Sequence, residues 1–219
     1  MSASKHAVLG TGMVGKAIAS KLVALGHPTR MGSRSKGNAT AVEWAGGAGE
    51  LAGEGTFGEV ARDAEVVWLA LKGEHALGVV ESLREELAGK VVLDLTNPLD
   101  FSQGFPPRLS VMNDDSLGEQ IQRAAPEARV VKTFNTLANT LMVEPQKLGE
   151  PTDVFVAGED AEAKATAVDI LRSFGHEAPI DMGGIAASRG LEAWLLLWTR
   201  LFGVFGSAEF NLKLVRPQS

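Results

Sequence analysis

The sequence contains no cysteine and no tyrosine. Without cysteine, the chain has no disulfide, no thiolate metal ligand and no thiolate nucleophile, a composition typical of proteins from a reducing compartment. Without tyrosine, it lacks the Tyr-x-x-x-Lys pair with which short-chain dehydrogenases transfer a proton. That class of oxidoreductase is therefore excluded.

Long apolar runs and an excess of positive charge are also missing. The most apolar stretch, residues 191–205, is interrupted by Glu192 and Arg200 and is shorter than the about 20 residues that a bilayer span needs. The N-terminal residues leave no room for the apolar core of a secretory signal. With 21 basic and 27 acidic residues, the net charge of −6 disfavours a nucleic-acid-binding surface. We expect a cytoplasmic protein with neither a membrane nor a nucleic acid as partner.

Hydrophobic residues make up 45% of the 219 residues, and glycine occurs 25 times without a repeating period. Short β-branched runs alternate with stretches of helical periodicity, which is the pattern of βαβ units. Strands are expected at 6–9, 29–32, 66–71, 91–95, 130–134 and 153–157. The sequence predicts an α/β fold of the Rossmann type, with a doubly wound, mainly parallel sheet and a short helical C-terminal segment.

Between these strands the helical signals differ in strength. The apolar residues of the first helix recur at helical spacing and are expected to pack on the sheet: Val14, Ile18, Leu22 and Leu25. A second helix is expected over residues 161–173, whereas residues 38–63 give only weak helical signals. Residues 101–115 follow a strand and are expected to form a long loop of the kind that often carries function.

The glycine motif Gly10-Thr11-Gly12-Met13-Val14-Gly15 lies between the first predicted strand and the first predicted helix. This is the context of the dinucleotide-binding motif: the first glycine allows a tight turn, the second lets a pyrophosphate approach, and the third lets helix pack on strand. Amides and the positive end of the helix dipole then face the phosphates. A purely structural turn is the alternative. Lys16 would suit a P-loop, but Ala17 stands where the magnesium-binding hydroxyl belongs, so that class is disfavoured.

The end of the second strand reads Gly32-Ser33-Arg34-Ser35-Lys36. An acidic residue at this position binds the ribose 2′-hydroxyl of NAD, whereas basic and hydroxyl groups accommodate the 2′-phosphate of NADP. Because the segment has no carboxylate and offers charge-assisted hydrogen bonds to a dianion, NADP(H) is favoured. A solvated basic turn is the alternative.

Three further strand ends lie at the carboxyl edge, where a doubly wound sheet binds its ligand. They lead to His75, to Asn97-Pro98 and to Asn135-Thr136. His75 is a weak candidate for proton transfer and equally a helix cap, and the two asparagines form turns or recognise an amide. The four histidines have no metal-binding spacing and there is no GxSxG motif, so we predict no metal site and leave the catalytic residue unknown.

Together these blocks resemble the coenzyme F420-dependent NADP oxidoreductases, and they are similar to the reductase domain of the six-transmembrane ferric reductases. The resemblance covers almost the whole chain. It rests on the glycine motif, the Gly32-Ser33-Arg34 strand end, Asp94 to Pro98, Lys132 to Thr136, Val154 to Gly158 and Asp181 to Gly184. One departure is Lys72-Gly73, where strict deazaflavin reductases tend to carry a Pro-Trp pair.

The resemblance implies NADP(H) as cofactor and a deazaflavin (F420) or a flavin as the small-molecule redox acceptor. It implies pyrophosphate on Thr11 to Val14 and the 2′-phosphate on Ser33, Arg34 and Lys36. The implied nicotinamide site is Leu71, Lys72, His75, Thr136, Leu137 and Ala138, beside the Asn97-Pro98 strand end. The acceptor is expected beyond it, against the loop after Asn97 and the segment after Asp181.

Residues 1–180 are thus expected to form the NADP(H)-binding domain, and residues 181–219 a helical segment that completes the acceptor pocket. The expected activity is hydride transfer between NADPH and F420. The alternatives are an NADPH-dependent flavin or ferric reductase and a non-enzymatic NADP(H)-binding regulatory module. Imine or hydroxy-acid reduction would call for a proton-donor lysine in a helix, and the sequence offers no clear one.

The predicted C-terminal helix, residues 189–205, has too many apolar residues for a single buried stripe. They are Trp194, Leu195, Leu197, Trp198, Leu201, Phe202 and Phe205. We therefore expect one face of the helix to pack on the sheet domain and the other on a second subunit, in a two-fold homodimer. Complete burial within one chain is the alternative.

Overall fold

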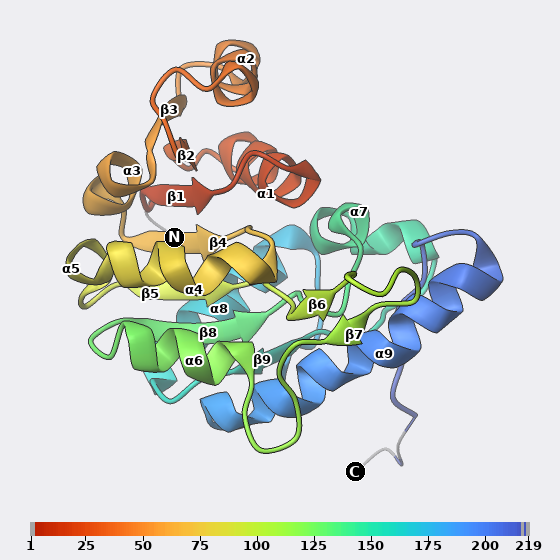
Figure 1. Ribbon diagram of the computed structural model, residues 1–219. Coiled ribbons are helices and arrows are strands. Elements are labelled where there is room, and N and C mark those ends of the chain that lie inside the picture. Colours follow the sequence, from red (N-terminus) through yellow and green to blue (C-terminus); the bar gives the residue numbers. More distant parts are fainter. Residues whose placement is uncertain (1–2, 216, 218–219) are drawn as a thin grey trace.

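The structure, a computed structural model, describes residues 3–215 and 217 (Figure 1). One eight-stranded sheet organises the chain, in the order β10-β9-β8-β5-β4-β1-β2-β3. Its strands are β1 (His6–Leu9), β2 (Thr29–Ser33), β3 (Ala52–Thr56), β4 (Val66–Leu69), β5 (Val91–Asp94), β8 (Arg129–Thr133), β9 (Phe155–Ala157) and β10 (Ile180–Asp181). All neighbours pair in parallel except β8 and β9, which are antiparallel.

Helices cover both faces of this sheet, which confirms the predicted doubly wound Rossmann-type fold. One face carries α1 (Met13–Ala24), α2 (Ala39–Ala48), α7 (Asn139–Val143) and α8 (Ala161–Phe174). The other carries α3 (Phe57–Asp63), α4 (Gly73–Ser82), α5 (Arg84–Leu87) and α6 (Leu117–Ala124). Because both faces are covered, the central strands are mostly apolar, and Ala7, Val8 and Leu9 of β1 are all fully buried.

The remaining elements lie at the two ends of the sheet. A two-stranded antiparallel sheet, β6 (Leu99–Asp100) with β7 (Arg108–Leu109), follows β5 at the carboxyl edge. Two short 3₁₀ segments, Pro145–Leu148 and Ile185–Ala187, precede β9 and α9 respectively. The long helix α9 (Ser188–Phe205) packs on β9 through Leu191 and crosses the sheet end toward β7 (Figure 1).

The structure differs from the expectations at four places. The strand β3 was missed, because the segment Ala-Gly-Glu-Gly-Thr has almost none of the β-branched residues that mark a strand. The expected loop over 101–115 is present and is interrupted only by the two-residue strand β7. Leu25 was placed in the buried stripe of the first helix, yet it is 41% exposed, because α1 ends at Ala24. The antiparallel pairing of β8 and β9 was not anticipated.

The antiparallel β9 determines the direction of α9. Since β9 runs opposite to β8 and β10 is parallel to β9, the chain leaves β10 in the direction of the amino edge of the central strands. Helix α9 then runs back in the opposite direction and ends beside β6 and β7 at the carboxyl edge (Figure 1). Within residues 3–215 and 217, no helix is both long and apolar enough to cross a membrane.

Candidate functional site

The glycine loop after β1 is shaped by two contacts and one open space. A Cβ on Gly10, which has a φ of +127°, would lie 2.2 Å from the carbonyl oxygen of Ala70, and one on Gly15 would lie 2.1 Å from that of Gly10. A Cβ on Gly12 would meet nothing within 4 Å. The outer glycines are therefore required by packing, whereas Gly12 keeps space open in front of α1, whose first amides have no intrahelical acceptor.

The end of β2 presents cationic side chains beside this loop. Arg34 is exposed, and the structure gives its guanidinium no hydrogen bond or ion pair among the described residues. The Ser33 hydroxyl donates to the Ser35 carbonyl oxygen at 2.6 Å, so the hydroxyl shapes the turn. Lys36 Nζ lies 3.8 Å from a carboxylate oxygen of Glu59.

The sequence of this strand end contains no carboxylate, but two carboxylates reach it from other elements, so the prediction was incomplete. Glu59, at the start of α3, approaches Lys36, and Glu54 of β3 accepts a hydrogen bond from the Gly37 amide at 3.2 Å. The pKa of Glu59 lies below its ordinary value, chiefly because the backbone amide of Thr56 donates to it. Strand β3 and helix α3 supply both carboxylates, and this part of the chain had given only weak signals in the sequence. Lys36 thus has a carboxylate nearby, whereas Arg34 has none within ion-pair distance among the described residues.

A cleft of about 740 Å³ lies next to the glycine loop, at the carboxyl edge of the sheet. This volume lies within the range of ligand pockets, about 300–1,000 Å³. Its walls come from α1, from the β4–α4 and β5–β6 connections and from the loop before β7. The lining residues are Val14, Leu71, Lys72, Gly73, Glu74, Leu95, Asn97, Leu99, Asp100, Phe101, Ser102 and Ser110.

The α4 start gives this cleft an exposed, charged rim. Lys72 is the N-cap of α4 without a side-chain cap hydrogen bond, so the cap interpretation of His75 was wrong. The His75 ring is 56% exposed and lies 3.7 Å from Glu74 Oε1. A Cβ on Gly73 would lie 2.0 Å from the carbonyl oxygen of Asn97, so the start of α4 touches the end of β5 at this point.

The two candidate asparagines bind each other. Asn97 Nδ2 donates to the backbone carbonyl of Asn135 at 2.9 Å, and Asn135 Nδ2 donates to Asn97 Oδ1 at 3.0 Å. Asn135 Nδ2 also donates to the carbonyl of Leu191 in α9. Both residues lie at the cleft end of the sheet, but only Asn97 is part of its wall. Of the next residues, Thr136 and Leu137 are buried and Ala138 is the N-cap of α7.

Beneath the asparagines lies a buried ion network that sequence reasoning missed. Lys132 of β8 is fully buried, and its Nζ lies 2.9 Å from Asp94 Oδ2 and 2.8 Å from Glu192 Oε1. It also donates to the carbonyl of Thr96 at 2.6 Å. The available signal was a lysine and an aspartate inside two apolar strands that the fold places side by side, in the register Asp94 to Lys132.

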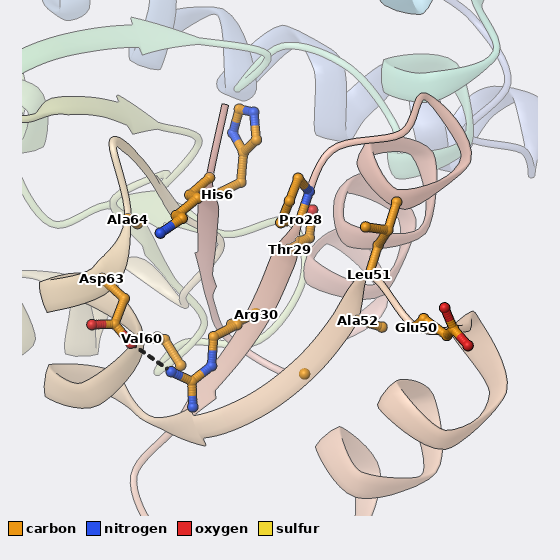
Figure 2. A pocket seen from close by; sticks show the side chains of 12 residues that line it. His6, Pro28, Thr29, Arg30, Glu50, Leu51, Ala52, Val60, Asp63 and Ala64 are labelled. Atoms are coloured by element: carbon orange, nitrogen blue, oxygen red, sulfur yellow. Dashed lines mark hydrogen bonds and ion pairs between the residues drawn. The ribbon is translucent and has the colours of Figure 1, made fainter. Parts of the chain in front are cut away.

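A second hollow, of about 380 Å³, opens at the opposite edge of the sheet (Figure 2). Its charged groups are partly paired, since Arg30 Nη1 lies 2.8 Å from Asp63 Oδ2. His6 on its inner side accepts a hydrogen bond from Trp68 Nε1, and burial, followed by the charge of His27, lowers its pKa to about 3. This hollow lies at the amino ends of the strands, away from the glycine loop, so we do not place the cofactor there.

Comparisons with known proteins point to one group of redox enzymes. A sequence model of the family "NADP oxidoreductase coenzyme F420-dependent" matches residues 5–98. The F420-dependent NADP reductase of Methanocaldococcus jannaschii is 33% identical over 138 residues, which cover 62% of this chain and 60% of that protein. The metalloreductase STEAP3 of Rattus norvegicus is 31% identical over 192 residues, which cover 87% of this chain and 36% of that protein. The chain thus matches less than two thirds of the length of either curated relative.

A solved structure extends the similarity to the whole chain. The crystal structure of a candidate F420-dependent NADP reductase from Arthrobacter sp. FB24 has 44% sequence identity and a TM-score of 0.92. The match covers 97% of this chain and 100% of that one, so it includes the C-terminal helix as well as the glycine loop. The chain belongs to the family of coenzyme F420-dependent NADP oxidoreductases.

Proposed function

We propose that the protein transfers hydride between NADPH and a planar acceptor, with the deazaflavin F420 as the acceptor of first choice. The observation that carries this proposal is the junction of two features: the glycine loop in front of α1 and the cleft beside it share Val14 in their walls. A dinucleotide laid along the loop would place its nicotinamide in a cleft that has room for a second ring system. The names of the family and of the Methanocaldococcus jannaschii relative both include F420.

In this proposal the chain binds and orients two reactants. The bound nicotinamide and the acceptor supply the redox chemistry themselves, so the protein contributes proximity, orientation and exclusion of water. The amides of Thr11 to Val14 face the pyrophosphate. Arg34 binds the 2′-phosphate, with Ser33 and Lys36 beside it.

The nicotinamide end of the same proposal lies at the strand ends around the cleft. Leu71 and the Asn97-Pro98 turn lie closest to it, with Lys72 and His75 on the rim and Thr136 to Ala138 behind. The cleft lining includes Lys72 and Glu74, which are exposed and lie 3.9 Å from each other, and direct hydride transfer needs neither of them as an acid or base. His75 remains a weak candidate for proton transfer at the rim.

The competing functions share the nucleotide site and differ in the acceptor. The match to a metalloreductase over 87% of this chain favours an NADPH-dependent flavin or ferric reductase as the second candidate. A regulatory module would bind NADP(H) without turnover. Oxidation of NADPH should therefore be followed in parallel with F420, FMN, FAD and ferric chelates. Turnover with F420 alone supports the proposal, turnover with flavin or iron alone supports the second candidate, and binding without any turnover supports the regulatory module.

We further propose that residues 181–219, of which 216, 218 and 219 lie outside the described part of the chain, complete the acceptor side of the cleft and form a homodimer through α9. The helix buries Leu191 and Leu195, whereas Leu197 is 50% exposed and Phe205 is 59% exposed. Part of the helix is covered by its own chain, since the Phe210 ring lies 5.3 Å from that of Trp198. Light scattering should give twice the mass of the 23.1 kDa chain, and a monomer at micromolar concentration would contradict the dimer.

A further inference from the structure

The buried ion network below the cleft uses every hydrogen-bonding position of its central ammonium group. Lys132 Nζ has three oxygen partners, one each from Asp94, Thr96 and Glu192. Burial opposes its charge, but the two carboxylates outweigh that effect and raise the pKa of Lys132 above its ordinary value. The lysine therefore stays charged, with its three N–H bonds aimed in fixed directions.

Both carboxylates are surrounded by donors. Asp94 Oδ1 accepts from the backbone amide of Thr96 at 2.9 Å and from its hydroxyl at 2.6 Å. Glu192 Oε2 accepts from the Leu117 amide and Oε1 from the Gly118 amide, both at 2.9 Å, at the N-terminus of α6. One lysine thus connects three elements: the end of β5, α9 and, through Glu192, the start of α6.

Stability alone is a poor explanation of such an arrangement. Desolvating three charges is costly, and apolar residues of similar volume often replace a buried ion network without loss of stability. Unlike an apolar cluster, the network fixes the orientation of the groups that it joins, because each hydrogen bond constrains both a distance and an angle.

Two sets of hydrogen bonds connect the ion network to the wall of the cleft. Lys132 and Asp94 both bind Thr96, the residue next to Asn97, so the turn after β5 is held from below. The reciprocal pair of Asn97 and Asn135 then ties this turn to the end of β8. Asn97 is part of the cleft wall, and its carbonyl touches Gly73 at the start of α4.

We propose that Lys132, together with Asp94 and Glu192, is the positioning element for the nicotinamide end of the cleft. Lys132 touches neither reactant and acts through Thr96 and the paired asparagines. Glu192 makes α9 part of the same unit, so the wall that receives the nicotinamide and the helix on the acceptor side move together. This inference rests on the proposed cofactor placement but does not depend on which acceptor is used.

The test separates the two halves of the cofactor. NADPH reaches the strand ends with its nicotinamide, whereas adenosine 2′,5′-bisphosphate carries only the part expected at the glycine loop and Arg34. The variant Glu192→Gln keeps the shape of the side chain but removes its charge and one acceptor oxygen. Calorimetric titration should show about tenfold weaker binding of NADPH, the size expected for about one lost hydrogen bond, with adenosine 2′,5′-bisphosphate unchanged.

The control is Lys90→Met, at the amino edge. Lys90 also makes three hydrogen bonds, to the carbonyls of Ala61, Arg62 and Ala64 at the end of α3, but it lies far from the cleft in the sheet. This variant should lower the melting temperature and leave the affinities for both ligands unchanged. Equal losses for NADPH and the bisphosphate in Glu192→Gln, or no loss for either, would overturn the proposal.

A second variant keeps the test decisive if Glu192→Gln does not fold. Asn135→Ala leaves the ion network intact and removes the hydrogen bonds that Asn135 Nδ2 donates to Asn97 Oδ1 and to the Leu191 carbonyl. The tie between the ends of β5 and β8 is then reduced to the bond from Asn97 Nδ2 to the backbone carbonyl of residue 135. It should reproduce the selective loss of NADPH affinity, and a parallel loss or none would count against the proposal. The readouts that decide the test are binding constants, so an enzyme that is inactive with every acceptor would refute the proposed reaction without affecting this test.

Discussion

Gly73 is the tightest point of the cleft wall, and replacing it with alanine is a direct test of that contact. The added Cβ would lie 2.0 Å from the Asn97 carbonyl oxygen, whereas ordinary contact begins at 3.4 Å, so α4 and the β5 end must separate by about 1.4 Å. Inserting a methyl group into a well-packed site costs about 1–3 kcal/mol. For a chain of this length, we expect the melting temperature to fall by about 2–4 °C per kcal/mol.

Gly78 provides a matched control in the same helix. A Cβ there would meet nothing within 4 Å, and its φ is not positive. Since alanine is favoured over glycine in a helix interior by about 0.8–1 kcal/mol, Gly78→Ala should raise the melting temperature. The assay is thermal unfolding followed by circular dichroism, together with titration of NADPH. Only Gly73→Ala should weaken NADPH. If Gly73→Ala were as stable as the wild type and bound NADPH equally well, the reasoning about a rigid wall would be refuted.

Three further predictions concern the cofactor loop and the histidine at the other edge. Gly12→Ala should leave stability within about 0.5 kcal/mol but weaken NADPH at least about tenfold, whereas Gly15→Ala should cost about 1–3 kcal/mol of stability because of its contact with Gly10. Arg34→Ala should weaken NADPH by about 1.5–3 kcal/mol and leave NADH nearly unchanged. His6, with a folded pKa of about 3 against 6.5, binds its proton more readily when unfolded, so below pH 6.5 stability falls as pH falls, by about 1.3 kcal/mol between pH 7 and 5.5.

Each of these has its own check. Equal binding of NADPH by Gly12→Ala and wild type would mean that the pyrophosphate does not approach there. Equal losses for NADPH and NADH in Arg34→Ala would reject the assignment of the 2′-phosphate. For the histidine, urea unfolding at several pH values should show a shallower acid dependence in His6→Gln than in the wild type, and identical slopes would contradict the buried neutral imidazole.

The fold and the glycine loop were predictable because their signals are local. Strand, tight turn and amphipathic helix follow one another along the sequence, and β1 has the predicted bounds His6–Leu9. The β2 end was only half predictable. Arg34 could be identified from the sequence, but Glu54 and Glu59 reach the same turn from β3 and α3, and this proximity depends on tertiary packing rather than on spacing.

The ion network was unpredictable for a related reason. The partner of Lys132 in β5 follows from strand order, but Glu192 is 60 positions further along the chain and arrives only because α9 crosses the sheet end. In the sequence, Glu192 merely interrupted an apolar run. Its carboxylate turns out to bind a buried lysine and the start of α6, so the residue that counted against a membrane span is the one that anchors the helix.

The path of α9 divides the helix into two parts that should differ in how well they tolerate substitution. Its first turns are tied to Lys132, Asn135 and the α6 amides, so substitutions there disturb several elements at once. Its last turns end in the exposed Val204 and Phe205. The end of this helix should therefore tolerate substitution with less disturbance to the rest of the fold than its beginning.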